Sequence, residues 1–275
     1  SLGWNDRLEN GFSYWVKGVL SDYQATITKY AGNDAGFYSQ SDGDGKYYVG
    51  QKIGEIWGYH SNGLFQSDDE AATIDQSELY AGKWGAGDVK YEDLDGDGKI
   101  TKGEETIYNP GDKSIIGNKT PRYQFGITVG FDYKNFDFEM FWQGTGKRDY
   151  MLSGAQFWGF TSQWDVPYTP ALDYWTETNT DAYFPRPGWQ NGGNRVTSDR
   201  YLQSAAYGRL KNLTVGYTIP KNLTTKWGIS RLRLYVTGEN LLTITPLNDA
   251  FDPETLGGLT YPINRKVAIG LNLTL

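Results

Sequence analysis

The most specific chemical signal in the sequence is an acidic stretch of twelve residues, 93–104. Its carboxylates stand at positions one, three, five and twelve, and a glycine stands at position six. This spacing of hard oxygen ligands around a sharp turn is the pattern that wraps Ca²⁺ in EF-hand loops. The candidate ligands are the side chains of Asp93, Asp95, Asp97, Thr101 and Glu104 and the main-chain carbonyl of Lys99.

The neighbours of this calcium-type loop indicate its role. Regulatory EF-hands carry an amphipathic helix on each side of the loop, whereas residues 84–91 show no helical pattern. We therefore expect a structural Ca²⁺ ion that stabilises a surface loop. The alternative is an ordinary polar turn built from Asp and Gly residues.

Aromatic side chains gather in a second candidate site, residues 145–204. Exposed aromatic rings offer a flat apolar face on which a ligand such as a sugar ring can stack. The candidates for ligand binding are Trp158, Trp164, Trp175 and Trp189. The alternative is that the rings form a small core that keeps a long loop folded, or pack against a lid.

Composition excludes several classes of protein. The chain of 275 residues has no cysteine and a single histidine, His60, which excludes disulfides, thiol catalysis and His-rich metal centres. We expect His60 to be a hydrogen-bonded loop residue, and no pair of carboxylates has a spacing that marks it as catalytic. A net charge of −7 argues against binding to nucleic acid. We therefore predict a protein that is not an enzyme.

The elements that would hold these sites are β-strands with two chemically different faces. Apolar residues alternate strictly with small or polar ones over 123–133 and 267–275. Most of the predicted strands span about 9–13 residues, which is longer than the usual 5–6 and enough for a tilted strand to cross a membrane. A slip of phase at 208–211 predicts a β-bulge. Five further segments alternate less strictly: 11–20, 23–30, 136–143, 205–219 and 230–242.

The links between the seven predicted strands alternate between short and long. Outer-membrane barrels have short periplasmic turns and long extracellular loops, so this rhythm predicts an all-β fold, an antiparallel transmembrane β-barrel segment. If the last strand ends in the periplasm, residues 11–20 run toward the periplasm and the chain begins outside. Since bacterial barrels have an even number of strands, seven strands predict part of a larger barrel. The short links are 21–22, 134–135 and 220–229, and the long ones are 31–121, 145–204 and 243–263.

Several blocks of sequence, in this order, resemble the C-terminal part of SusC/RagA-type TonB-linked outer-membrane transporters. The resemblance is good over 90–275 and loose over 1–65, and one departure is Leu275, where such barrels usually end in an aromatic residue. Besides the calcium-type loop, the blocks are IGN at 116–118, TPRYQFG at 120–126, YKNFDF at 133–138, FWQG at 141–144, DYWT at 173–176, RLKNLTVGY at 209–217, RLRLY at 231–235, NLL at 240–242, DPE at 252–254, YP at 261–262 and GLNL at 270–273.

The resemblance implies that residues 1–275 are the C-terminal part of a plugged barrel of about 22 strands. Residues 31–121, with the calcium-type loop, and residues 145–204 would be extracellular loops. It also implies TonB-dependent import of a glycan or a peptide across the outer membrane of a Gram-negative bacterium. The implied partners are a SusD-like surface lipoprotein, the rest of the barrel and its plug, outer-membrane lipid, and TonB through an N-terminal part that this chain lacks.

Two rival interpretations stay open on the sequence alone. A soluble calcium-dependent β-sandwich that binds or cleaves carbohydrate would show the same alternation of apolar and polar residues. A fragment of a passive porin would show the same long loops. Dependence on detergent separates the first rival from a barrel, and a plug domain encoded upstream would separate the second.

Overall fold

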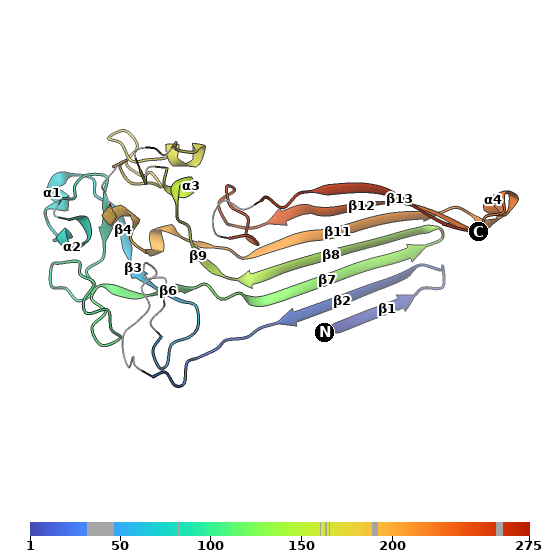
Figure 1. Cartoon of the computed structure of the whole chain (residues 1–275), viewed down its shortest axis with the longest axis horizontal. Coiled ribbons are helices and arrows are strands. Elements are labelled where there is room, and N and C mark those ends of the chain that lie inside the picture. Colours follow the sequence, from blue (N-terminus) through green and yellow to red (C-terminus); the bar gives the residue numbers. More distant parts are fainter. Residues whose placement is uncertain are drawn as a thin grey trace.

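A long antiparallel sheet of seven strands forms one end of the molecule, as the computed structural model shows (Figure 1). The structure describes residues 1–31, 47–81, 83–159, 161–162, 164, 166–188, 192–256 and 261–275. The fold is therefore all-β and antiparallel, as predicted. The strands follow one another in chain order: β1 (Leu2–Arg7), β2 (Ser13–Ser21), β7 (Arg122–Tyr133), β8 (Phe136–Lys147), β11 (Tyr207–Thr218), β12 (Arg231–Ile244) and β13 (Lys266–Thr274).

The register of these strands gives the sheet one apolar face and one polar face. Successive residues of a strand point to opposite faces, so cross-strand partners share a face. One row of partners across all seven strands consists of Trp4, Val16, Val129, Met140, Leu213, Gly238 and Val267. The adjacent row, on the other face, consists of Asn5, Trp15, Gly130, Glu139, Thr214, Thr237 and Ala268.

The apolar face is uncovered in this structure. Trp4 is 64% exposed and Val267 is 70% exposed, and Ile269 on the same strand is 83% exposed. A soluble β-sandwich would bury such a face against a second sheet. The other sheets within the described residues have only two strands each. A continuous apolar surface of this kind requires an apolar environment.

A bulge in β11 explains the slip of phase in the sequence. The register shifts between Leu210 and Asn212 toward both neighbouring strands, which leaves Lys211 without a cross-strand partner. Because of this extra residue, Leu210 and Leu213 both fall on the apolar face although they are three positions apart. The predicted bulge is confirmed.

The two N-terminal strands differ from the prediction. The sequence predicts strands at 11–20 and 23–30, whereas the sheet contains β1 and β2, and residues 22–31 form no strand. The polar residues of β1 hide its alternation, and the apolar residues of 23–30 find a loop partner instead of a sheet. The N–H of Ile27 donates to the carbonyl of Gln51, and the N–H of Ile53 donates to that of Ala25, both at 2.9 Å.

This change also reverses one predicted direction. In Figure 1, β2 runs toward the mass of loops at one end of the sheet, and β1 runs away from it. The sequence predicts the opposite direction for residues 11–20, because its pattern places a turn at 21–22. The turn lies instead at residues 8–12, between β1 and β2. Short and long links still alternate.

The long links fold together into one body at that end of the sheet (Figure 1). We call the described residues within 47–118, 149–205 and 247–256 the loop body. Three two-stranded sheets pair β3 with β6, β4 with β5 and β9 with β10. Its elements are β3 (Glu55–Tyr59), β4 (Ser61–Leu64), α1 (Asp68–Ala71), α2 (Ser77–Tyr80), β5 (Val89–Tyr91), β6 (Lys113–Asn118), β9 (Asp149–Met151), α3 (Ala155–Trp158), η1 (Thr169–Leu172), η2 (Gly192–Arg195), η3 (Asp199–Tyr201) and β10 (Leu202–Ser204).

The loop body has its own hydrophobic core, drawn from all three segments. Val89, Tyr201 and Leu152 have no exposed surface, and Leu247 is 3% exposed. The core gives the long links a stable fold outside the sheet. The remaining elements, α4 (Lys221–Thr224) and η4 (Thr225–Trp227), lie in the turn at the opposite end of the sheet. Within the described ranges, no helix is long and apolar enough to span a membrane.

Candidate functional site

The calcium-type loop is fastened to the loop body by its eighth residue. Ile100 is 1% exposed, and its N–H donates to the carbonyl of Asp75 at 2.7 Å. Asp93 closes the turn by accepting hydrogen bonds from the N–H groups of Gly98 and Gly96, at 2.7 and 2.6 Å. These bonds hold the pKa of Asp93 below its usual range, with Gly98 the largest cause. The first predicted ligand is therefore held in place as a carboxylate.

Three carboxylates meet in this loop, and one of them lies outside the twelve-residue pattern. Oxygen atoms of Asp93, Asp95 and Asp112 lie within 4.8 Å of one another. Asp112 is fully buried and accepts hydrogen bonds from the N–H groups of Leu94 and Thr101, both at 2.7 Å. Burial raises the pKa of Asp112, and the charges of Asp95 and Asp93 raise it further.

The other predicted acidic ligands are not members of this cluster. Asp97 accepts a hydrogen bond from the N–H of Lys99 at 2.8 Å, and Glu104 is exposed at the surface. The next residue, Glu105, forms an ion pair with Lys113 at 2.7 Å. The geometry therefore brings two of the predicted acidic ligands together and adds a third that the sequence pattern does not contain.

Two glycines bring Asp112 to the loop. Gly103 and Gly111 have left-handed φ angles of 57° and 58°. A Cβ atom on Gly103 would lie 2.4 Å from the nitrogen of Gly111, so the two chain segments can cross this closely only without side chains. Asp112 follows this crossing directly. The Pro-Gly-Asp turn at 110–112 is the sequence signal that could have identified it.

The predicted ligand-binding tryptophans have different environments. Trp175 is 8% exposed within the core, and Trp158 packs against the same core. Trp164 is 83% exposed. Trp189 lies outside the described residues. For Trp175 and Trp158 the structure thus shows packing in the core of a folded loop, the alternative that the sequence left open.

A small cavity lies beside Trp158. Its volume is about 40 Å³, which is room for a water molecule and too little for a sugar ring. The lining includes Tyr174, Phe184, Arg186 and Asn194. Trp158 therefore contributes packing to the loop body. Among the described tryptophans predicted to bind a ligand, Trp164 is the one whose side chain is largely exposed.

His60 stands at the centre of a hydrogen-bonded chain that joins three segments. Its Nδ1 atom lies 2.7 Å from Oδ2 of Asp199, and its Nε2 atom lies 2.6 Å from Oγ of Ser114. The other oxygen of Asp199 accepts a hydrogen bond from the N–H of Ser61 at 2.9 Å. The contacts confirm His60 as a hydrogen-bonded loop residue.

The order serine, histidine, aspartate in this chain is also that of acyl-transfer triads. A nucleophilic serine additionally needs preorganised donors for the oxyanion. Ser114 lies within β6, opposite Gly58 of β3, and not on a sharp turn that exposes its hydroxyl beside free N–H groups. The hydrogen bonds of His60 therefore connect the end of β3 to β6 and to η3.

A buried polar network joins the segment after α2 to η2. Asp88 has no exposed surface and accepts hydrogen bonds from the side chains of Asn194 at 2.8 Å and Arg186 at 3.1 Å. Asn194 in turn accepts hydrogen bonds from the N–H of Val89 and the hydroxyl of Tyr80. Burial raises the pKa of Asp88, while these partners oppose that effect. Nothing in the local sequence pattern indicates this network.

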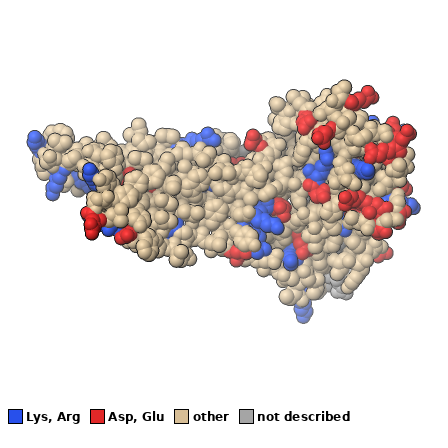
Figure 2. Space-filling view, turned by 180° about the vertical axis from the view of Figure 1, so that it is seen from behind, with Lys and Arg blue, Asp and Glu red and all other residues tan. Residues whose placement is uncertain are grey.

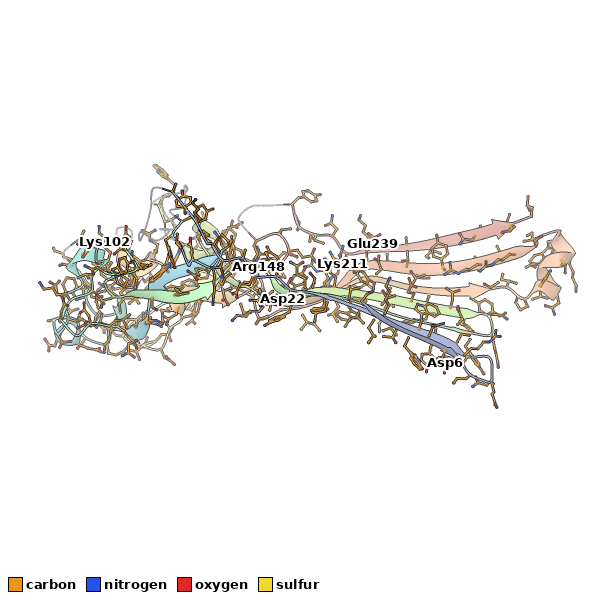
Figure 3. The ribbon with its side chains drawn as sticks, turned by 90° about the horizontal axis from the view of Figure 1, so that it is seen from below. Asp6, Asp22, Lys102, Arg148, Lys211 and Glu239 are labelled. Carbon is orange, nitrogen blue, oxygen red and sulfur yellow. The ribbon has the colours of Figure 1, made fainter. Side chains whose placement is uncertain are left out.

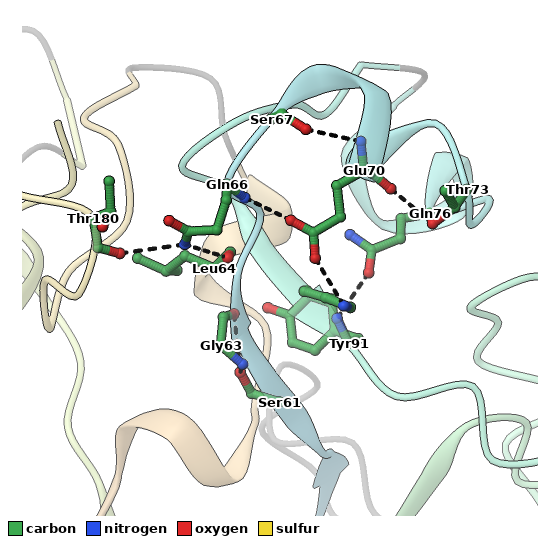
Figure 4. A network of polar contacts seen from close by, with 11 residues as sticks. Ser61, Gly63, Leu64, Gln66, Ser67, Glu70, Thr73, Gln76, Tyr91 and Thr180 are labelled. Carbon is green, nitrogen blue, oxygen red and sulfur yellow. Dashed lines mark hydrogen bonds and ion pairs between the residues drawn. The ribbon is translucent and has the colours of Figure 1, made fainter. Parts of the chain in front are cut away.

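A second polar network fixes α1 (Figure 4). The N–H of Glu70 donates to Oγ of the N-cap residue Ser67 at 3.1 Å. The Glu70 carboxylate accepts from the N–H of Gln66 at 2.7 Å and from Lys90 at 2.8 Å. The arrangement is close to a capping box, with the carboxylate reaching one residue further back. This network connects α1 to Lys90 of β5.

Polar contacts also connect the chain segments at the junction between the sheet and the loop body. Asp22 and Arg122 form an ion pair, and Arg148 donates to the carbonyl of Lys119 at 3.2 Å. Asp149 accepts a hydrogen bond from the N–H of Asn118 at 2.9 Å. Figure 3 shows Asp22, Arg148 and Lys211 where the sheet meets the loop body, while Lys102 lies far out on the loop body. Several side chains therefore hold together the segments through which the chain passes from the sheet into the loop body.

No family model matches the chain. The TonB-dependent receptor P3 of Formosa agariphila is 34% identical over 245 residues, which are 82% of this chain and 22% of that protein. The TonB-dependent receptor SusC of Bacteroides thetaiotaomicron is 26% identical over 190 residues, 66% of this chain and 17% of that protein. The RagAB peptide transporter superposes with a TM-score of 0.70 at 18% identity, over 98% of this chain and 28% of that chain.

The chain belongs to the SusC/RagA family of TonB-dependent receptors. It corresponds to part of the barrel region of that family and spans about a quarter of the length of the relatives it matches. TonB-dependent receptors are proteins of the Gram-negative outer membrane, as predicted. The family is one of transporters, which are not enzymes.

The surface of this SusC/RagA-family chain suits that location. Figure 2 shows acidic side chains gathered over the loop body, while the sheet between the two ends of the molecule carries little charge on the face in view. Charged residues on the lipid side of a barrel strand are costly, and apolar residues on that side are required. The seven-stranded sheet thus matches a section of barrel wall, and its row from Trp4 to Val267 has the apolar character that a lipid-facing surface needs.

Proposed function

We propose that the chain forms a section of the barrel wall and the outer loops of a transporter that imports a nutrient across the outer membrane with energy from TonB. The observation that carries the proposal is the division of the wall into an apolar and a polar face across all seven strands. The likeness to TonB-dependent receptors and to the RagAB fold supports it. The loop body would lie on the extracellular side, where barrels of this class carry their long loops.

We further propose a glycan or a peptide as the nutrient and a SusD-like lipoprotein as the partner. The likeness to the RagAB peptide transporter supports the peptide and the lipoprotein partner. The glycan is the alternative that the sequence resemblance implies. Among the described tryptophans predicted to bind a ligand, Trp164, which is 83% exposed, is the one available to either a ligand or the lipoprotein. Trp158 and Trp175 would act indirectly, by holding the loop body in shape.

Uptake by cells that carry the full-length gene tests the import function. One mixture of labelled oligopeptides and one of labelled oligosaccharides serve as probes, and a deletion strain serves as the control. We expect one mixture to enter, and entry to stop when a protonophore removes the energy that TonB uses. Entry that persists without this energy would show a passive pore. A full-length protein that stays monodisperse without detergent would contradict the barrel itself.

We also propose that the calcium-type loop binds one structural Ca²⁺ ion. The support is the ligand spacing of residues 93–104 together with the meeting of Asp93, Asp95 and Asp112. Asp112 would then supply carboxylate oxygen that the pattern assigns to Glu104. Oxygen ligands with several negative charges suit Ca²⁺, whose coordination is flexible. The ion would offset the mutual repulsion of the three carboxylates.

Calcium titration of the full-length protein tests this site. We expect Asp93→Ala with Glu104→Ala to abolish binding, and Asp112→Asn alone to weaken it about tenfold or more, because a buried ligand charge is lost. Asp69→Asn, an exposed residue of α1, is the control and should leave the affinity unchanged. Unchanged calcium affinity in the double variant would disprove the site. Loss of binding in Glu104→Ala alone, with unchanged affinity in Asp112→Asn, would restore the twelve-residue ligand set.

A further inference from the structure

The last long link, residues 245–265, contains a segment that touches both parts of the molecule. Its first half belongs to the loop body. Leu247 is 3% exposed in the core, and Leu256 packs against the same core. The ring of Phe251 lies 6.3 Å from that of Phe157. The N–H of Asn248 donates to the side chain of Gln203 at 3.0 Å.

The acidic residues of the same segment reach the barrel wall. Asp252 accepts a hydrogen bond from Nη2 of Arg209 at 2.6 Å, and Glu254 accepts one from Nζ of Lys211 at 2.7 Å. Nη1 of Arg209 also lies 3.2 Å from Glu254, without the alignment of a hydrogen bond. Pro253, between the two acids, is buried and restricts the backbone. Asp252 and Glu254 thus pair with Arg209 and Lys211, two cationic side chains of β11.

Arg209 is the buried centre of this arrangement. Its side chain is 3% exposed, and its Nε atom donates to Oγ1 of Thr243 on β12 at 2.8 Å. A buried guanidinium is tolerated only when it is paired, and removing one partner leaves the others as uncompensated charges. Lys211, two positions further along β11, pairs with the same carboxylate of Glu254.

We propose that Arg209 is a positioning residue that clamps residues 247–256, and through them the loop body, onto the barrel wall. The clamp places the loop body at the mouth of the lumen, where an imported ligand would enter. This role rests on the proposed import function, because it matters for transport only if the lumen is the path. The partner of the clamp is within the same chain, so the contact needs no ligand to form.

Hydrogen exchange of the full-length transporter in detergent tests the clamp. In Arg209→Met, we expect exchange of the amides of 248–256 to become about tenfold faster or more, because Asp252 and Glu254 lose their buried partner. Exchange in β8 and β12 should change little. Arg209→Met combined with Asp252→Leu should restore protection, since apolar side chains can replace a buried ion pair while Glu254 keeps its partner Lys211.

Arg233→Met is the matched control, because Arg233 forms its ion pair with Asp137, which lies on the wall and not in the loop body. It should leave exchange of 248–256 unchanged. Unchanged exchange in Arg209→Met would overturn the clamp, and so would faster exchange spread evenly over the wall strands. The readout needs no substrate, so a failure of the import assay with the expected exchange pattern would count against the proposed function alone.

Discussion

At the scale of single residues, the calcium-type loop depends on the carboxylates of its aspartates and on glycines, which have no side chain. Asp93 and Asp112 are both held by two backbone N–H groups, yet their pKa values move in opposite directions. Asp93 is at the surface, so hydrogen bonds dominate, whereas Asp112 is buried, so desolvation dominates. The approach of Asp112 requires the bare backbones of Gly103 and Gly111. The acidic cluster is thus created by a close crossing of two chain segments.

Replacement of Gly103 by alanine tests this crossing. The new Cβ atom would lie 2.4 Å from the nitrogen of Gly111, at a φ angle of 57°. We expect a loss of local stability above the 1–3 kcal/mol, roughly, that left-handed strain alone costs. Amide exchange of residues 100–112 measures it. Gly96→Ala is the control, because its φ is 78° and no atom lies within 4 Å of its Cβ position. Equal effects of the two variants would show that the crossing tolerates a methyl group.

At the scale of elements, short helices and small sheets in the loop body persist because side chains satisfy their ends. A helix of four residues such as α1 has no stability of its own. Ser67 caps its N-terminus, and Glu70 connects it to Gln66 and Lys90. The carboxylate near the helix N-terminus is favourable as an anion. These bonds hold the pKa of Glu70 below its usual range, the Gln66 bond being the largest cause.

A pH dependence of α1 follows from that lowered pKa. A carboxylate whose pKa is lower in the folded state stabilises the fold above the usual glutamate range and loses this effect as the pH falls through the lowered pKa. We expect the protection of the amides of 67–73, corrected for intrinsic exchange, to fall in that acid range. Glu70→Gln should remove the dependence. Glu92→Gln, an exposed residue outside the network, should keep it. A dependence that survives Glu70→Gln would assign it to another group.

At the scale of the whole molecule, two surfaces of opposite character follow from strand register. The row from Trp4 to Val267 is apolar, and the adjacent row from Asn5 to Ala268 is largely polar. Alternation along each strand is a local property, but the continuity of both rows depends on pairing between strands far apart in the chain. We assign the first surface to the lipid side of the barrel wall.

A charge placed on one face of β12 and then on the other tests this assignment. Val236→Arg puts a cation on the apolar face, opposite Val215 and Ile269. We expect it to destabilise the folded barrel by about 2–4 kcal/mol if it lies near the bilayer centre. Thr237→Arg, on the other face of the same strand, should cost far less. Folding of the full-length protein into lipid vesicles, followed by gel mobility without heating, measures both. A greater loss with Thr237→Arg would reverse the two faces.

The sequence by itself determined the class of fold, most strands of the wall and the calcium-type spacing, because strand alternation and ligand spacing are local patterns. Residues 123–133 and 267–275 show this directly, and so does the bulge near Lys211. The sequence did not determine that residues 23–30 leave the sheet, since a strand also needs a partner. It could not identify Asp112 as a member of the acidic cluster either.

Only the tertiary structure decided which distant residues meet. Asp199 reaches His60 and Asn194 reaches Asp88, each across more than a hundred residues. Asp252, in the link between β12 and β13, pairs with Arg209 of β11. The core of the loop body likewise buries Trp175, which the sequence offered as a ligand-binding residue. Such contacts depend on how separate chain segments pack to bury apolar surface and pair buried charges, and no local spacing records that choice.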